Sequence, residues 1–157
     1  MSSSRYFMPF GAELKEDGKT RFHLWAPGAE SVELVIESET ADVEDSGLTM
    51  APEEDGWWGL STTTASEHTR YRFRIDGQTL VPDPASRRQE DDVHGPSVVV
   101  NPESWDWQDD DWRGRPWEEA VIYELHVGSF TPEGTFEGVR KRLDHLLELG
   151  VTAIELM

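Results

Sequence analysis

Polar and apolar side chains alternate with a period of two in three short segments of the first hundred residues. The segments are residues 20–27, 31–37 and 70–77. Successive side chains of a strand point to opposite faces, so this alternation predicts strands with one buried face and one face in water. The side chains expected to face a core are Phe22, Leu24, Val32, Leu34, Ile36, Tyr71, Phe73 and Ile75.

Turn signals separate these segments and predict antiparallel pairing between them. Asp76 and Gly77 follow the clearest strand directly. Both central residues of a type I′ turn need a positive φ, which suits the pair Asp-Gly. Further turns are expected at residues 16–19 and 55–56. Short strands joined by tight turns are typical of an antiparallel β-sandwich, which we predict for residues 1–100.

The alternation stops at Asn101, and residues 101–118 follow neither a strand period nor a helix period. This stretch holds two prolines and four tryptophans, which are Trp105, Trp107, Trp112 and Trp117. Large rings commonly anchor irregular chain by packing against a neighbouring surface. We therefore expect an ordered connector that is held in place by its indole rings.

From residue 119 on, the pattern becomes that of an α/β protein. Residues 120–127 and 151–157 form two apolar runs, which predict strands, and helical spacing relates the apolar residues between them. These residues are Phe136, Val139, Leu143, Leu146 and Leu147. Thr135 suits the N-cap of this helix, and Gly150 suits the position after its end.

A strand, a helix and a strand in this order predict a βαβ unit with two parallel strands. Parallel strands are normally covered on both faces. One helix cannot provide that cover for residues 119–157, so we expect them to be the start of a larger α/β domain that is cut short here.

Composition excludes several classes of protein. The chain carries 32 acidic and 14 basic side chains, and its formal net charge of −18 disfavours nucleic acid and anionic membranes as partners. No apolar run approaches the length of about 18 residues that spans a membrane. The first residues lack the basic and apolar parts of a signal peptide, so a cytoplasmic location is expected.

Three lysines stand against eleven arginines in this acidic chain. Such a surface suits a salt-rich cytoplasm, where screening removes the repulsion between acids. An acidic protein of an ordinary source is the alternative. Because the chain has no cysteine, it forms neither disulfides nor thiolate metal sites.

Few residues suggest catalysis by themselves. The sequence has no phosphate-binding glycine loop and no nucleophile elbow, and its histidines are scattered. They are His23, His68, His94, His126 and His145. The sequence therefore predicts neither a metal nor an organic cofactor.

Tryptophans and arginines are the candidates for ligand contact. Sugars stack their apolar faces on indole rings, and Trp57 and Trp58 are neighbours in a predicted strand, so one should point inward and the other outward. We favour a core residue beside a partly covered one, with a carbohydrate contact as the alternative. Arg70, Arg72 and Arg74 are interpreted as a solvent-facing row paired with acids, with a ligand role as the alternative.

One long segment carries a family resemblance. "VIYELHVGSFTPEGTFEGVRKRLDHLLELGVTAIELM" resembles the opening of the catalytic barrel in the α-amylase family of glycoside hydrolases, including barrel strands 1 and 2. The predicted sandwich is similar to the N-terminal module of that family. The resemblance implies a β-sandwich (immunoglobulin-like, E-set type) followed by the first β-α-β unit of a truncated (β/α)8 barrel.

A second segment narrows the resemblance from the whole α-amylase family to one group of its enzymes. Residues 80–97, "LVPDPASRRQEDDVHGPS", resemble the segment that joins module to barrel in malto-oligosyltrehalose trehalohydrolases. Gly128 stands where branching enzymes and isoamylases tend to carry an arginine. The resemblance implies an enzyme that cleaves the α-1,4-glucosidic bond next to the terminal trehalose of maltooligosyl trehalose. The alternatives are a glycogen branching or debranching enzyme of the same family, and a free-standing α-glucan-binding module.

The resemblance also implies a retaining mechanism with an aspartate nucleophile, a glutamate acid and base, and a second aspartate that holds the distorted sugar. These groups belong to barrel strands 4, 5 and 7. The resemblance therefore places no catalytic residue on this chain, and its substrate-binding residues stay unassigned. Glu124 and Glu155 match no catalytic motif, and we assign them to packing or polar support of the barrel strands.

Overall fold

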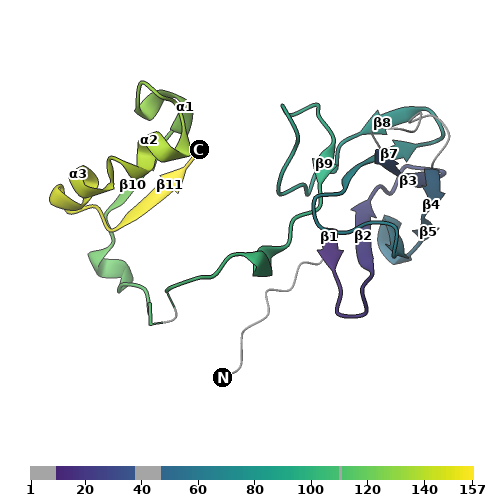
Figure 1. Cartoon of the computed structure of the whole chain (residues 1–157), viewed down its shortest axis with the longest axis horizontal. Helices are drawn as coiled ribbons and strands as arrows, with labels where there is room; N and C mark the ends of the chain where they lie inside the picture. The colour runs from purple at the N-terminus through teal and green to yellow at the C-terminus, as the bar shows by residue number, and fades with distance from the viewer. Residues whose placement is uncertain (1–9, 38–46, 110) are drawn as a thin grey trace. The chain divides into compact units, whose positions relative to one another are not determined.

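The computed structural model describes residues 10–37, 47–109 and 111–157 (Figure 1). The chain divides into two compact units, Met1–Asp106 and Trp107–Met157, and this division falls inside the predicted connector. No helix in the described ranges has both the length and the apolar character needed to cross a membrane. The strands of the first unit are β1 (Gly11–Leu14), β2 (Thr20–Trp25), β3 (Val32–Glu37), β4 (Gly47–Thr49), β5 (Ala51–Pro52), β6 (Trp57–Thr62), β7 (Arg70–Ile75), β8 (Thr79–Val81) and β9 (Ser97–Val98).

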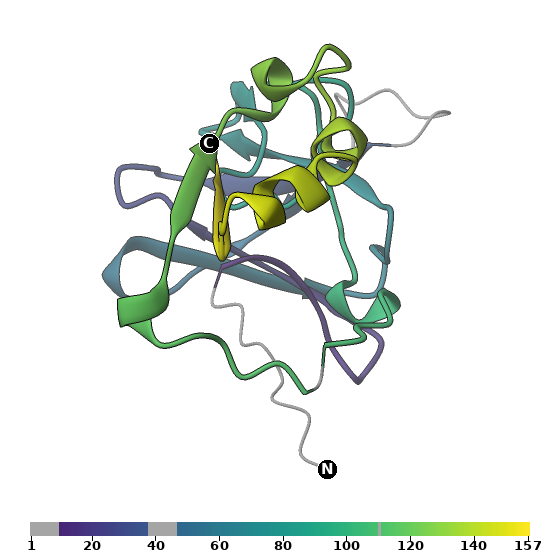
Figure 2. The ribbon, with the colours of Figure 1, turned by 90° about the vertical axis from the view of Figure 1, so that its left-hand side faces the viewer.

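Two antiparallel sheets make up the first unit (Figures 1 and 2). One sheet has the order β1-β2-β6-β5, and the other has the order β4-β3-β7-β8, with β9 also pairing with β7. Their inner faces share a single core, in which Phe22 of β2 meets Tyr71 of β7 edge to face at 4.8 Å between ring centroids. The predicted antiparallel sandwich is confirmed.

The predicted inward side chains form this core. Six of the eight are buried, and Ile36 and Ile75 are partly buried against the same cluster. Val35 departs from the prediction, because it is buried although it shares the outer face with the arginines. It lies directly opposite Arg72 in the register. Long charged side chains cover apolar neighbours with their aliphatic stems, which accounts for this burial.

The arginine row of β7 pairs with acids, as predicted. Arg72 Nε lies 2.9 Å from Glu37 Oε1, and Arg74 Nη1 donates to Glu33 Oε2 at 2.9 Å. Both acids belong to β3, the strand that pairs with β7. Opposite charges on neighbouring strands stabilise a sheet modestly, so these pairs support the register of β3 on β7.

The turn at Asp76 and Gly77 has the predicted conformation. Their φ angles are 51° and 69°, and the Gln78 N–H donates to the Ile75 carbonyl at 3.1 Å. Asp76 has a second role that the sequence did not predict. Its Oδ1 accepts hydrogen bonds from the backbone N–H groups of Glu30 and Ser31 at 2.8 and 2.9 Å. The hairpin is thereby tied to the loop before β3.

A buried hydrogen-bonded pair holds the segment after β8 to the core. The Tyr71 hydroxyl donates to Asp83 Oδ2 at 2.7 Å, and the Ala85 N–H donates to Asp83 Oδ1 at 2.7 Å. The Asp83 N–H donates in turn to Ser97 Oγ at 2.9 Å. Burial raises the pKa of Asp83, although the hydrogen bonds from Tyr71 and Ala85 and the charge of Arg87 oppose that shift. Burial also raises the pKa of Tyr71.

The second unit contains two parallel strands, as predicted. Its elements are η4 (Trp117–Glu119), β10 (Ile122–Leu125), α1 (Val127–Phe130), α2 (Phe136–Arg140), α3 (Leu143–Glu148) and β11 (Ala153–Leu156). β10 pairs with β11 in parallel, and Leu125, Val139 and Leu146 form a small core beside them. A barrel is not evident in the part of the chain that the structure describes.

The predicted first strand of this unit was too long at its C-terminal end. β10 ends at Leu125, and the chain then turns into α1. The His126 carbonyl accepts from the N–H groups of Ser129 and Phe130 at 3.1 and 3.0 Å. These local bonds form one helical turn in place of further strand pairing, so residues 126 and 127 leave the strand.

The single predicted helix is two helices, α2 and α3. Arg142 between them has φ −104° and ψ 2°, and its N–H bonds only three residues back, to the Val139 carbonyl at 2.9 Å. This tight turn separates α2 from α3. Of the five apolar positions predicted to share one face, only Val139 and Leu146 are buried, whereas the others are exposed.

Both predicted helix ends are confirmed. Thr135 caps α2, because its Oγ1 accepts from the Gly138 N–H at 3.1 Å. Gly150 follows α3 with φ +83°, and its N–H donates to the Leu147 carbonyl at 2.9 Å. The Val151 N–H reaches back to the Leu146 carbonyl at 3.1 Å. These two bonds make a Schellman motif, which favours glycine because of the positive φ.

The expectation for the connector tryptophans was wrong. Trp105, Trp107, Trp112 and Trp117 are 68%, 65%, 55% and 77% exposed. The described residues of this stretch form the short turns η3 (Pro102–Ser104) and η4, and none of them pairs with a sheet. The described residues of the connector form no strand or α-helix, so the connector offers no packed face of its own to cover these rings.

Candidate functional site

Aromatic side chains gather on the outward face of the β1-β2-β6-β5 sheet. Because β2 buries Phe22 and Leu24, its alternate residues point outward. Trp25 of β2 lies directly opposite Trp57 of β6 in the register. Trp58 is inward and buried, with its Nε1 donating to the Ala26 carbonyl at 3.1 Å. The prediction that Trp57 and Trp58 face opposite sides is therefore confirmed.

Three rings on this face are nearly parallel. The His23 and Trp57 rings stack with centroids 4.4 Å apart and 19° between their planes. Phe10 lies 6.2 Å from Trp57 at an interplanar angle of 11°. Together with Trp25, these rings form what we call the aromatic face, defined as Phe10, His23, Trp25 and Trp57.

Trp25 offers the most accessible ring of β2 and β6, and its orientation is held by the backbone. Its side chain is 58% exposed, yet its Nε1 donates to the Asp55 carbonyl at 3.0 Å. Asp55 and Gly56 have φ angles of 57° and 81°, and a Cβ at Gly56 would lie only 2.5 Å from Pro27 Cβ. The tight turn thus places a hydrogen-bond acceptor at the edge of an exposed ring. A ring that is oriented before binding loses less entropy when a ligand arrives.

Polar groups border the aromatic face. Arg21 Nη2 lies 3.1 Å from His23 Nδ1, and because a guanidinium can only donate, Nδ1 is the acceptor. The ring proton is then on Nε2, which donates to Glu53 Oε2 at 2.7 Å. The Glu53 carboxylate lies over Gly59, where a larger residue would displace it. Arg21, His23 and Glu53 therefore form a hydrogen-bonded chain along the rings.

This combination suits a sugar. The axial C–H groups of a pyranose ring form an apolar surface that packs on an aromatic ring, and its hydroxyls bond to carboxylate and guanidinium groups at the edge. The face is open and its polar groups bond to one another, which fits binding and orientation of a ligand better than chemistry on it. The aromatic face is the candidate binding site of the first unit.

The remaining candidates lie elsewhere. Glu124 of β10 is directly opposite Glu155 of β11 in the parallel register, and both are exposed. His68 lies just before β7, in the first unit, and His126 and His145 belong to the second unit. Within the described ranges, no three His, Cys, Asp or Glu side chains gather as they would around a metal ion.

Neither Trp25 nor His23 stands out in the sequence as a binding residue. The available signal was the alternation of β2, which places both residues outward whenever Phe22 and Leu24 are buried. The decisive information is that β6 pairs with β2 and so brings Trp57 beside them. That pairing joins residues more than thirty positions apart, and no local pattern encodes it.

Comparisons with known proteins bear on this face. The model of carbohydrate-binding module 48 (isoamylase N-terminal domain) matches residues 9–93, which is more than half of the chain. Several malto-oligosyltrehalose trehalohydrolases are similar to it at 37–43% identity. The trehalohydrolase of Saccharolobus solfataricus is 43% identical over 150 residues, which are 96% of this chain and 25% of that protein.

Solved structures of other proteins are also similar to this chain. A Salmonella typhimurium protein assigned to the alpha amylases has a TM-score of 0.82 and 42% identity, over 97% of this chain and 25% of its own. A pullulanase of Paenibacillus barengoltzii, solved with maltohexaose and alpha-cyclodextrin, has a TM-score of 0.71 and 26% identity, over 96% of this chain and 27% of its own. The chain therefore spans about a quarter of the length of the relatives that it matches.

Proposed function

Because this chain belongs to the carbohydrate-binding module 48 (isoamylase N-terminal domain) family, we propose that its first unit binds α-glucans through the aromatic face. The observation that carries this proposal is the exposed and oriented Trp25 ring beside the stack of His23 and Trp57. The neighbouring chain of Arg21, His23 and Glu53 would bond to sugar hydroxyls.

We further propose that the chain is the N-terminal part of a cytoplasmic glycoside hydrolase that releases trehalose from maltooligosyl trehalose by a retaining mechanism. The 37–43% identity to trehalohydrolases supports this activity. In this proposal residues 1–100 are the module, residues 101–118 are the connector, and residues 119–157 begin the catalytic barrel. The parallel pair of β10 and β11 is compatible with barrel strands 1 and 2.

A debranching enzyme of the same family is the second candidate. The likeness to a pullulanase, with a TM-score of 0.71, favours it. Sequence identity to that pullulanase is 26%, against 43% for the trehalohydrolase of Saccharolobus solfataricus, and this difference supports the trehalohydrolase. The two candidates share the α-glucan, so glucan binding by the aromatic face is common to both.

Replacement of Trp25 by alanine is expected to weaken maltoheptaose binding by about tenfold or more, because about 1.4 kcal/mol of ring stacking is lost. Isothermal titration calorimetry on the whole chain measures this change. Trp57→Ala should act in the same direction, since it removes the ring on which His23 stacks.

Trp112→Ala is the matched control, because it removes an equally exposed tryptophan of the connector. It should leave the affinity for maltoheptaose unchanged. The aromatic face is not the glucan site if Trp25→Ala binds as tightly as the unaltered chain, or if Trp112→Ala weakens binding to the same degree.

The chain of 157 residues is expected to release no trehalose from maltooligosyl trehalose, although it binds glucan. The reason is that the family's catalytic groups belong to barrel strands 4, 5 and 7, and no position of this chain corresponds to them. Trehalose formation is measured against a heat-inactivated sample. Turnover above that background would show that catalytic groups lie within these residues.

A further inference from the structure

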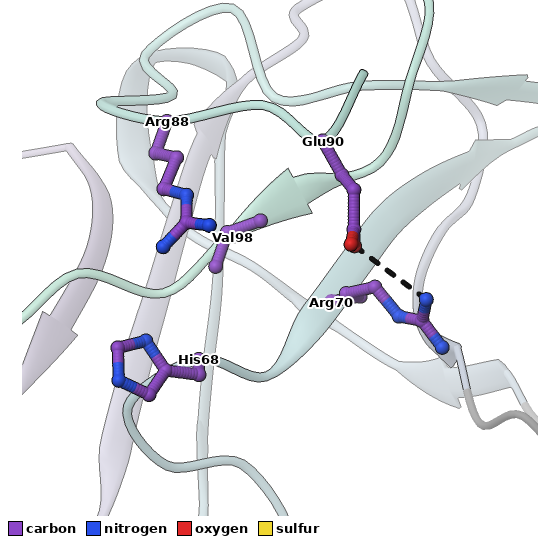
Figure 3. A pocket seen from close by; sticks show the side chains of 5 residues that line it. All are labelled: His68, Arg70, Arg88, Glu90 and Val98. Carbon is purple, nitrogen blue, oxygen red and sulfur yellow. Dashed lines mark hydrogen bonds and ion pairs between the residues drawn. The ribbon is translucent and has the colours of Figure 1, made fainter.

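A pocket opens on the outer face of the other sheet, where β9 joins β7. Its volume is about 450 Å³. Arg70 of β7 and Val98 of β9 are directly opposite in the register and therefore share this face. The lining residues are His68, Arg70, Arg88, Glu90 and Val98 (Figure 3). None of them belongs to the aromatic face, which lies on the β1-β2-β6-β5 sheet.

The charges in this pocket are unevenly distributed. Figure 3 shows Arg88 and His68 on one side of Val98, while Arg70 and Glu90 approach each other on the other side. Arg70 Nη1 is 3.5 Å from Glu90 Oε2. Within the described part of the chain, the Arg88 guanidinium and the His68 ring make no hydrogen bond or ion pair. The Arg88 guanidinium therefore lines the pocket without an ion-pair partner among the described residues.

Backbone hydrogen bonds to β9 and its continuation hold the main chain of Arg88 and His68, and both residues are exposed. The Arg88 carbonyl accepts from the Val98 N–H at 2.8 Å and from Ser86 Oγ at 2.6 Å. The His68 N–H donates to the Val99 carbonyl at 2.9 Å, and His68 has φ +69°. A positive φ is uncommon for a residue other than glycine and persists where the surroundings hold it. The two side chains therefore start from fixed backbone positions at the same pocket.

We propose that this pocket binds the phosphate group of a small phosphomonoester. A guanidinium binds two phosphate oxygens at once through its planar fork, and the His68 ring would supply a donor for a third. The volume lies within the range of about 300–1,000 Å³ that holds small molecules. Val98 provides an apolar wall, and the Glu90 carboxylate on the far side would accept hydrogen bonds from hydroxyls of the organic part.

The test is titration of the whole, isotopically labelled chain with inorganic phosphate and with glucose 6-phosphate, followed by NMR at constant ionic strength. Saturable shifts at the amides of residues 68, 88 and 98 are expected with both probes. Equal affinities would assign the phosphate group alone as ligand, and tighter binding of glucose 6-phosphate would assign a sugar phosphate. Sodium acetate should bind at least tenfold more weakly, because it lacks the third oxygen.

Three single substitutions should change the phosphate affinity of the pocket, two by lowering it and one by raising it. Arg88→Gln should weaken phosphate binding about tenfold, because it removes the bidentate donor. His68→Asn, which tolerates a positive φ, should weaken it severalfold. Glu90→Gln should instead strengthen it severalfold, because it removes a negative charge from the pocket wall.

Arg115→Gln and Glu118→Gln are the controls, because they make the same changes of net charge at exposed positions of the second unit. They should leave phosphate affinity unchanged. The proposal is overturned by the absence of saturable shifts, by acetate binding as tight as phosphate, or by Arg115→Gln weakening binding as much as Arg88→Gln. If Arg88→Gln does not fold, Glu90→Gln provides the test instead. An unchanged phosphate affinity of Glu90→Gln would then refute the site.

Discussion

Phe73→Ala is expected to lower the free energy of unfolding of the sandwich by about 3–5 kcal/mol, the usual cost of truncating a buried phenylalanine. Phe73 of β7 has no exposed surface, faces Leu34 across the strand pair and contacts the Tyr71 ring at 5.8 Å between centroids. The sandwich cannot collapse around the void, because both sheets hold their register through backbone bonds. Small domains are stable by only about 5–15 kcal/mol, so this variant should be close to unfolding.

Urea-induced unfolding of the whole chain measures this loss of unfolding free energy. Hydrogen exchange of the β3 and β7 amides shows that the loss belongs to the sandwich. Thermal unfolding should shift down by roughly 12 °C or more. Phe136→Ala provides the matched control, because the same substitution removes a ring that is 71% exposed. Its effect on the sandwich should stay within about 0.5 kcal/mol. A loss below that value for Phe73→Ala would contradict the single core shared by both sheets.

The second large effect is expected for Tyr71→Phe, which removes only a hydroxyl. Without it, Asp83 Oδ2 is buried and has lost its 2.7 Å hydrogen bond. A buried acceptor left without its donor costs about 1–3 kcal/mol at neutral pH. The ring itself keeps its packing, so the loss reports on the hydrogen bond and not on a cavity.

This loss should depend on pH. Burial already raises the pKa of Asp83 above its ordinary value of 3.8, and the Tyr71 hydrogen bond opposes that rise. Removing the hydroxyl therefore raises the pKa of Asp83 further. A group whose pKa is raised by folding contributes stability that is complete below its unfolded pKa and is lost as the pH rises through its folded pKa. The destabilisation by Tyr71→Phe should thus be largest at pH 7 and shrink as the pH falls toward 3.8.

Equilibrium unfolding in urea at pH 4 and pH 7 tests this dependence. Asp83→Asn is the matched variant, because the amide oxygen can still accept from the Ala85 N–H while the titrating charge is gone. Placing Tyr71→Phe in the Asp83→Asn background should give a loss that no longer changes between the two pH values. An equal pH dependence in both backgrounds would show that another group is responsible.

Local signals in the chain predicted the long strands β2, β3 and β7 but not the short strands β1, β4, β5 and β9. The alternation around Phe22, Leu34 and Phe73 predicted strands and their buried faces, because side-chain direction in a strand has a fixed period of two. Asp76, Gly77 and Gly150 predicted turns and a helix end, because few residues adopt a positive φ at low cost. Each of these inferences depends on neighbours within a few positions.

Local signals failed where a nearby hydrogen bond competed with the repeating pattern. The apolar run from residue 120 continues past Leu125, but carbonyl bonds at His126 close a helical turn and end β10 there. The apolar spacing from residue 136 to residue 147 is helical, yet the three-residue bond at Arg142 breaks it into two helices. A single tight turn cannot be detected from periodicity, because the apolar residues before and after it keep nearly the same spacing along the sequence.

By itself the sequence determined the inward side of β2, β3 and β7, the hairpin turn at Asp76 and Gly77, and that β10 and β11 run in parallel. Only the tertiary structure decided which outward residues meet. β6 pairs with β2, which sets Trp57 beside Trp25 and His23. β9 pairs with β7, which brings Arg88 and His68 to one pocket, and the segment after β8 carries Asp83 to Tyr71. The reason is physical: burial and turn geometry are set by a residue and its neighbours, whereas strand order is set by the packing of the whole core.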